Sequence, residues 1–355
     1  MVIREDDSSG RTDDDDGEGS RGSEVQTVSG SPNDGKSELL KRNDMNPILW
    51  AGDWPYPINT VFNAAATRLP NGETLLLARV EDRRGISHLC AARSKDGVTD
   101  WRVDPEPTLM PDPKNHPEEA WGIEDARIVW LDELHAYAVT YTSYSRGGPG
   151  VSLALTQDFR TFERRGVAMT PLDKDASLFP RRFDGRWAMI HRPDATHLGT
   201  HIWVSFSPDL KHWGDHTLVI EARRGAWWDA NKIGLSTPPI ETDEGWLLIY
   251  HGVRQTPANS LYRLGLALLD KANPLKCLLR SDEWIFGPEA PYERLGDVPD
   301  VVFPCGHTVA DDGDTINVYY GAADTAIALA TGSIQAMLTW LRAHGRPGDV
   351  PLDDV

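Results

Sequence analysis

Two carboxylates and an arginine stand together in the run GIEDARI, residues 122–128, directly after a turn-rich segment. An aspartate such as Asp125 can donate a proton to a leaving oxygen, and its neighbour Glu124 supplies a second acid. If Asp125 faces a site, Glu124 is expected to point away from it, because side chains alternate along a strand. A structural Asp–Arg ion pair that ties two strands together explains the same run, and the sequence leaves this alternative open.

Basic residues recur along the chain at comparable places. Arg83 and Arg84 lie on a connection between two strands, Lys174 precedes an apolar strand, Lys232 precedes a Gly/Pro-rich turn, and His251 ends a strand. Each of them alone is explained as a surface or packing residue. Brought together at one centre, they would form the electropositive pocket that a phosphate group requires.

Motifs of several common enzyme classes are missing from the sequence. It contains no P-loop, no GxGxxG run after a strand, no HExxH and no GxSxG, so nucleotide-binding, zinc-protease and esterase functions lack support. The three cysteines show no CxxC or Cys/His spacing, which argues against a disulfide framework and against a zinc site. We therefore expect no metal and no organic cofactor.

Short strands are the elements that must position these residues. Runs rich in β-branched and aromatic residues, bounded mostly by Gly, Asp or Asn, cover residues 74–80, 135–144, 186–192, 245–253 and 315–321. Helical spacing is confined to residues 333–344, where one face carries Ile334, Met337, Leu338 and Leu341. The pattern predicts an all-β fold with one short C-terminal helix.

An internal repeat indicates how the strands are arranged. Asp96, Asp158, Asp209 and Asp270 each follow one strand and precede another, at separations of 62, 51 and 61 residues. Four-stranded propeller blades with loop insertions give spacings of this kind, and a fifth unit begins near Val302. The repeat predicts a five-bladed β-propeller; a β-sandwich is the alternative, but it would not produce such regular recurrence.

Composition and charge restrict the partners. The net charge of −18 argues against nucleic acid, although a local cluster of Lys and Arg can still bind a small anion. The 13 tryptophans outnumber the 9 tyrosines, and tryptophan packs between strands as readily as it stacks on a sugar ring. The start of the chain lacks the apolar run of a signal peptide, and no stretch of 18 apolar residues follows. We expect a cytoplasmic protein without a membrane partner.

The two ends of the chain differ from its centre. Residues 1–45 contain the acidic run Asp13–Asp16 among Gly, Ser and Thr, with almost no aromatic residues. Such a segment buries too little apolar surface to offset its ordering entropy, so we predict disorder there; a partner-binding tail is the alternative. The expected domains are this tail, a propeller over residues 46–345 and a C-terminal tail over residues 346–355.

Taken together, the motifs resemble those of glycoside hydrolase family 130, the β-mannoside phosphorylases. The resemblance extends from about Asn46 to Met337 and depends on a series of segments in order: VFNAAATRLPNGETLLLARVEDRRGISHL, GIEDARI, KDASLFPRRFDGRWAMIHRP, NKIG, GWLLIYHGV, YRLGLALLD, VVFPCG and YYGAADTAIALA. It implies a five-bladed propeller that cleaves β-mannosides with inorganic phosphate and releases α-mannose 1-phosphate with inversion. Phosphate is then a co-substrate, and the leaving-group sugar stays open.

The resemblance also implies roles for individual residues. Asp125 would be the general acid. Phosphate would be bound by Arg83 or Arg84 with Lys174, Lys232 and His251. Contacts to the sugar would come from Asn63, Glu124, His197, Phe303 and Asp324. The sequence departs from the family pattern at EDAR, where EDPR is typical, which puts the leaving-group preference in doubt.

Phosphate is itself an anionic nucleophile, so a phosphorylase can omit the base that an inverting hydrolase needs. One acid with a group of cations therefore favours phosphorolysis. Two alternatives remain at this point: a β-mannoside hydrolase on the same fold, and a sugar-binding propeller without turnover. Members of this family often form homo-oligomers, and the sequence does not decide the oligomeric state.

Overall fold

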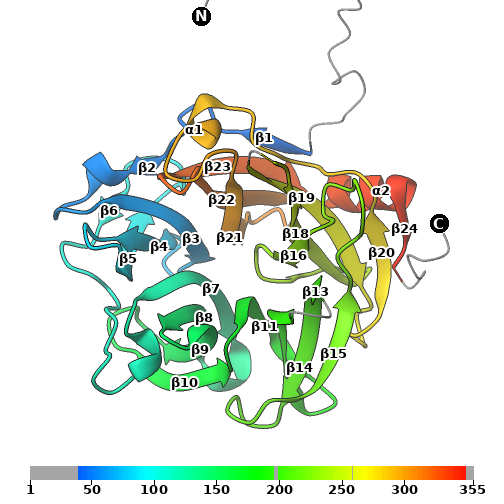
Figure 1. Ribbon diagram of the computed structural model, residues 1–355, viewed down its shortest axis with the longest axis horizontal. Coiled ribbons are helices and arrows are strands. Elements are labelled where there is room, and N and C mark those ends of the chain that lie inside the picture. The colour runs from blue at the N-terminus through cyan, green and yellow to red at the C-terminus, as the bar shows by residue number, and fades with distance from the viewer. Residues whose placement is uncertain (1–38, 196–198, 258, 349–355) are drawn as a thin grey trace, which may run out of the picture. The chain divides into compact units, whose positions relative to one another are not determined.

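The computed structural model describes residues 39–195, 199–257 and 259–348. They form an all-β fold in which the described residues contain two α-helices, α1 (Pro291–Arg294) and α2 (Ile334–His344) (Figure 1). Three short 3-10 turns cover residues 51–53, 117–119 and 132–134. Within the three described ranges, no helix has the length and apolar character needed to cross a membrane.

Antiparallel meanders of four strands make up the sheets (Figure 1). The first contains β3 (Thr60–Arg68), β4 (Thr74–Glu81), β5 (Ser87–Ser94) and β6 (Arg102–Val103). The second contains β7 (Ile123–Leu131), β8 (Ala136–Ser145), β9 (Gly148–Thr156) and β10 (Glu163–Met169). Strand β13 (Gly199–Thr200) joins the third and fourth meanders into one larger sheet.

The third meander contains β11 (Asp173–Phe183), β12 (Arg186–Ala195), β14 (Ile202–Ser207) and β15 (Gly214–Ile220). The fourth contains β16 (Lys232–Leu235), β18 (Trp246–Gln255), β19 (Ser260–Leu269) and β20 (Cys277–Ser281). The fifth contains β21 (Val302–Val309), β22 (Thr315–Ala322), β23 (Ala326–Ser333) and β1 (Leu40–Arg42). Short strands β2 (Leu49–Trp50), β17 (Ile240–Glu241) and β24 (Gly345–Pro347) pair with β23, β18 and β20.

The first strand of each meander carries part of the site. Strand β3 contacts β7, β7 contacts β11, β11 contacts β16, and β21 contacts β3. Strands β3 and β7 are buried along almost their whole length, whereas the fourth strand β10 alternates between exposed and partly buried residues. Successive first strands therefore meet in the interior, and residues far apart in sequence are brought together there.

The hydrophobic core consists of clusters that each combine side chains from two neighbouring meanders. Residues that share a cluster include Leu77 with Val139, Leu153 with Met189, Ile190 with Leu248, Leu266 with Val318, and Leu329 with Leu76. The last pair links the fifth meander to the first, so every meander shares an apolar cluster with the one before it and the one after it.

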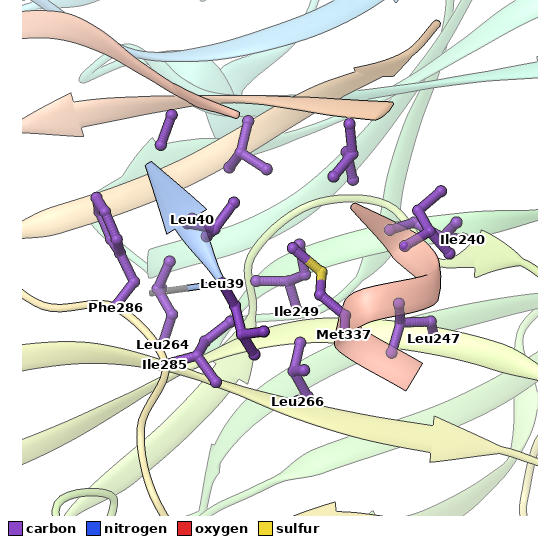
Figure 2. Close-up of a cluster of buried hydrophobic side chains, with 14 of the residues drawn as sticks. Leu39, Leu40, Ile240, Leu247, Ile249, Leu264, Leu266, Ile285, Phe286 and Met337 are labelled. Carbon is purple, nitrogen blue, oxygen red and sulfur yellow. The ribbon is translucent and has the colours of Figure 1, made fainter. Parts of the chain in front are cut away.

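The N-terminal boundary expected from the sequence is wrong. Strand β1, within the segment expected to be a tail, pairs with β23 and completes the fifth meander. Leu39 and Leu40 enter the cluster between the fourth and fifth meanders, where they lie near Ile249 and Met337 (Figure 2). A three-residue strand has no recognisable local pattern, because its stability comes from a partner almost 300 residues away. Residues 1–38 lie outside the described part of the chain.

The C-terminal helix and the repeated turns agree with the sequence. Helix α2 buries Ile334, Met337, Leu338 and Leu341, and the hydroxyl of Ser333 caps its first turn by accepting a bond from the Ala336 amide. The boundary after residue 345 is wrong by a few residues, since β24 extends to Pro347.

The four repeat aspartates each follow the third strand of a meander. Their carboxylates accept backbone N–H bonds from the residues two and three positions later, as Asp96 does from Val98 and Thr99. This local turn explains why the same residue type recurs.

Candidate active site

In three meanders, a bulge near the start of the first strand directs polar side chains towards a common cavity. Asn63 in β3, Asp125 in β7 and Asp175 in β11 have positive φ angles of 46°, 48° and 53°, and the strand register shifts at each of them. A bulge places two residues opposite one and breaks the alternation of side chains. Glu124 and Asp125 consequently both bind Arg79, so the expectation that Glu124 points away is wrong.

These bulges border a cavity of about 330 Å³. Its walls carry both signs of charge and a few apolar and aromatic groups: Asn63, Arg79, Asp125, Pro149, Leu172, Asp173, Lys174, Asp175, Arg192, Asp194, Lys232, His251, Tyr262, Val298, Val301, Phe303 and Asp324. The residues come from all five meanders and the loops that connect them.

Asp125 is buried and held from two sides. Its Oδ1 accepts a bond of 2.9 Å from Asn63 Nδ2 and lies 3.2 Å from a guanidinium nitrogen of Arg79. Burial disfavours the charged carboxylate, but the nearby cations Arg79, Lys174 and Arg127 outweigh burial and hold the pKa of Asp125 below its ordinary value. In the absence of ligands Asp125 is therefore an anion at neutral pH.

Asp324 is another acid of this cavity, and its pKa is shifted in the opposite direction. Burial, followed by the negative charge of Asp125, raises its pKa to about 7, although Arg79 acts in the other direction. The two carboxyls thus lie in the same cavity with pKa values displaced in opposite directions. A carboxyl with a pKa raised this far is partly protonated near neutral pH, which allows it to donate a hydrogen bond.

The cavity wall also carries cations. Lys174 Nζ lies 3.3 Å from Glu124 Oε2, and Arg192 Nε donates to Asp175 Oδ2 at 2.6 Å. Lys232 Nζ lies 5.4 Å from the centre of the Tyr262 ring. Within the described residues, Lys232 has no carboxylate within 4 Å, so its charge is available to an anion.

His251 is fully buried beside these cations. Its Nε2 lies 3.4 Å from Asp175 Oδ2, and its ring packs against Phe303 at a centroid distance of 4.7 Å. Burial lowers the pKa of His251 despite the charge of Asp175. A neutral imidazole is therefore expected near pH 7, and it contributes hydrogen bonding more than charge.

The arginine of the GIEDARI run holds the interior together. Arg127 is almost completely buried and donates to the backbone oxygens of Asp125, Leu235 and Ser236. It also lies 3.5 Å from Asp175. Arg127 thereby ties β7 to the end of β16. Linking two strands is the structural role that the sequence analysis considered for this arginine.

Most of the expected site residues come together. Residues on the cavity wall are Asn63, Asp125, Lys174, Lys232, His251, Phe303 and Asp324, and Glu124 lies next to it through Arg79 and Lys174. His197 lies outside the described residues.

Arg83 and Arg84 are the exception, because neither borders the cavity. Both are exposed on the turn between β4 and β5, and Arg84 binds Asp82. The arginines that do border the cavity are Arg79 on β4 and Arg192 on β12, which the sequence reasoning missed. Arg79 could have been recognised from the sequence, because it interrupts the apolar run 74–80 and a charge within a buried strand needs a partner.

Among the residues that the structure describes, no group of three or more His, Cys, Asp and Glu side chains is arranged to hold a metal ion.

An acid held on a bulge near several cations, in a cavity lined by all the β-meanders, defines an enzyme site suited to a hydroxyl-rich substrate and an anion. The comparison with family models places the chain more specifically. It belongs to glycoside hydrolase family 130, described as β-1,4-mannooligosaccharide phosphorylase, and the match covers residues 55–343.

Characterised relatives agree with this placement. The chain is 33% identical to a β-1,4-mannooligosaccharide phosphorylase of Ruminococcus albus, over 86% of this chain and 92% of that protein. It is 38% identical to a 1,2-β-oligomannan phosphorylase of a Thermoanaerobacter species, over 82% and 96% of the two chains. A solved β-1,2-mannobiose phosphorylase from Listeria innocua, in complex with β-1,2-mannobiose, superposes with a TM-score of 0.77 at 30% identity and covers 86% of this chain and 99% of that one.

Proposed function

We propose that the protein is an inverting β-mannoside phosphorylase, which converts a β-mannosyl disaccharide or oligosaccharide and phosphate into α-mannose 1-phosphate and a shortened sugar. The observation that carries the proposal is one cavity containing Asp125 together with Arg79, Lys174, Arg192 and Lys232. The relatives named as phosphorylases of mannosides, at 33% and 38% identity over most of the chain, support it.

A five-bladed β-propeller is part of the same proposal. It is supported by the four-stranded meanders, by the apolar clusters between neighbouring meanders, and by β1, which completes the last meander with the first strand of the chain. In such a fold the first strands surround a central funnel, and a site built from all five meanders follows from that arrangement.

Phosphate is proposed to bind between Lys174, Arg192 and Lys232, beside His251 and Tyr262. Three cations in a partly enclosed cavity attract a dianion more strongly than exposed side chains do, because water screens them less. Arg192 also offers a planar guanidinium that is fixed by Asp175, which suits phosphate oxygens.

The mannosyl unit is proposed to bind near Asn63, Asp324 and Phe303. The buried Asn63 Oδ1 has no hydrogen-bond partner among the described residues, while Nδ2 of the same amide donates to Asp125. A buried polar atom normally has a partner, so a sugar hydroxyl that donates to Oδ1 would satisfy it. Asp324 in its protonated form would donate to another hydroxyl of the same ring.

The reaction requires one proton transfer. A phosphate oxygen attacks the anomeric carbon, the glycosidic C–O bond breaks, and the leaving oxygen receives a proton from Asp125, directly or through a sugar hydroxyl. From the hydrogen phosphate dianion this gives mannose 1-phosphate as a monoanion and leaves Asp125 ionised. Bound phosphate would raise the pKa of Asp125 from its low value, since the anion offsets the effect of Lys174 and Arg79.

An inverting hydrolase would need a second free carboxylate as its base, and two carboxylates of the cavity wall are poorly placed for that role. Asp173 is bound by His191 at 2.6 Å and by the Arg192 amide, and Asp175 is bound by Arg192 and Arg127. Both carboxylates are therefore occupied by cations or hydrogen-bond donors and are poorly suited to activate water.

The test is incubation of the purified protein with β-1,4- and β-1,2-linked mannooligosaccharides, with and without inorganic phosphate. We expect α-mannose 1-phosphate to appear only when phosphate is present. Free mannose formed equally well without phosphate would indicate a hydrolase, and saturable binding without any product would indicate a sugar-binding protein. The cytoplasmic location, the absence of a cofactor and a homo-oligomeric state stay predictions.

A further inference from the structure

An exposed tryptophan lies next to the catalytic strand at the end where the acids are found. Trp121 is 48% exposed and stands two residues before β7, which carries Glu124 and Asp125. Its ring meets that of Tyr144 edge to face, with centroids 5.5 Å apart and an interplanar angle of 74°. This geometry covers only part of the two rings, so aromatic surface stays available to solvent.

The position of Trp121 is fixed by backbone bonds and a close approach. Its amide donates to Tyr144 O at 2.7 Å, and the Tyr144 amide donates to Gly122 O at 3.0 Å. Gly122 has a φ of 118°, and a side chain there would collide with the backbone of Ser87 at 2.8 Å. The backbone that carries Trp121 and Tyr144 is therefore fixed before any ligand binds, which reduces the entropy cost of binding.

Two chains of contacts connect this aromatic pair with the cavity. Ser87, which Gly122 touches, accepts a bond from Arg79 Nε at 2.9 Å, and Arg79 binds Asp125. On the other side Tyr144 is the cross-strand partner of Pro149, a residue of the cavity wall. Directly opposite residues in a sheet have Cβ atoms about 5 Å apart on the same face, so the Trp121–Tyr144 pair continues the wall outwards.

From these contacts we propose that Trp121 and Tyr144 form an outer subsite that stacks on a distal sugar ring on the leaving-group side of a β-mannosyl oligosaccharide. Pyranose rings present C–H groups on their faces, and tryptophan offers a broad apolar plate with one donor. The terminal mannosyl unit occupies the buried end near Asp125, so the remaining units extend out of the cavity, and the proposal places them along the wall that Pro149 connects to this pair. The inference rests on the proposed function for the identity of the sugar.

The chain provides a matched control on the same strand. Trp130 is 39% exposed, lies near the opposite end of β7, and packs edge to face on Tyr137 of β8, as Trp121 packs on Tyr144. At about 3.3 Å per residue, the two tryptophans are separated by about 30 Å. Substitution of Trp130 therefore removes a partly exposed tryptophan that lies far from the cavity end of β7.

The experiment compares wild type, Trp121→Ala, Trp121→Phe and Trp130→Ala with mannooligosaccharides of two to five units in both linkages. For Trp121→Ala we expect kcat/KM to change less than about twofold on the disaccharide and to fall about tenfold on the longer sugars. Trp121→Phe should recover much of the loss, and Trp130→Ala should resemble wild type. Thermal unfolding of each variant identifies any that fail to fold; if Trp121→Ala does so, the partial loss that remains in Trp121→Phe, confined to the longer sugars, carries the test.

Titration of the same sugars without phosphate, in an Asp125→Asn background, measures binding separately from turnover. If wild type releases no mannose 1-phosphate but longer sugars still bind through Trp121, the proposed reaction fails and the subsite stands. Equal losses on all chain lengths, no loss on the longer sugars, or the same loss in Trp130→Ala would overturn the subsite.

Discussion

The raised pKa of Asp324 leads to a prediction about stability that does not depend on the substrate. An acid whose pKa is about 7 in the folded protein, and about 3.9 when unfolded, binds more protons in the folded state between these two values. Stability therefore falls as pH rises through this window, and the full cost of the buried charge is present above pH 7. Asp324→Asn removes this cost while it preserves size and shape.

The size of the effect follows from the same shift. One pKa unit corresponds to about 1.4 kcal/mol, so three units give at most about 4 kcal/mol above pH 7. Between pH 5 and pH 8, the stability advantage of Asp324→Asn over wild type should grow by up to about 2.5 kcal/mol. The remaining exposure of the side chain reduces this difference in stability, and we expect about 1–2 kcal/mol.

Urea unfolding of wild type and Asp324→Asn at pH 5 and pH 8 measures this difference, in buffers free of phosphate because phosphate would bind the same cavity. Asp243→Asn is the control for loss of one negative charge, since the side chain of Asp243 is fully exposed. The reasoning would be refuted by a stability difference between Asp324→Asn and wild type that is the same at both pH values, or by a variant that is less stable than wild type at pH 8.

Further substitutions test the other parts of the site and the closure of the fold. Asp125→Asn should keep the fold and lower phosphorolysis at least 100-fold, as loss of a general acid does; near-normal release of mannose 1-phosphate would disprove the assignment. Arg79→Met should cost about 3–5 kcal/mol in urea unfolding by leaving buried carboxylates unpaired, whereas the exposed Arg84→Ala should cost less than 1 kcal/mol; equal costs would contradict the ion-pair argument. Lys232→Met should raise the KM for phosphate about tenfold or more with little change in the KM for the sugar, and an effect on the sugar alone would place phosphate elsewhere. Leu40→Ala should destabilise the fold by about 2–5 kcal/mol; a loss below 1 kcal/mol would mean that β1 is dispensable.

Local sequence determined much of the fold. The alternating runs became strands, the recurring aspartates became turns that bind the amides two and three residues later, and the apolar face of residues 333–344 became the buried face of α2. These features depend on contacts within a few residues, which a sequence displays directly. The family motifs also predicted that Asp125, Lys174, Lys232 and His251 belong to one site, and these residues do border a single cavity.

Tertiary structure decided the features that depend on distant partners. The bulge at Asp125 brings Glu124 and Asp125 to the same guanidinium, that of Arg79. Only the three-dimensional arrangement shows this, and it also shows that Arg84 pairs with Asp82 instead. Strand β1 looked like part of a tail because its stabilising partner β23 lies at the other end of the chain. The buried charges of the cavity and the short strand β1 are both stabilised by groups that are remote in sequence. A local sequence pattern therefore does not reveal them.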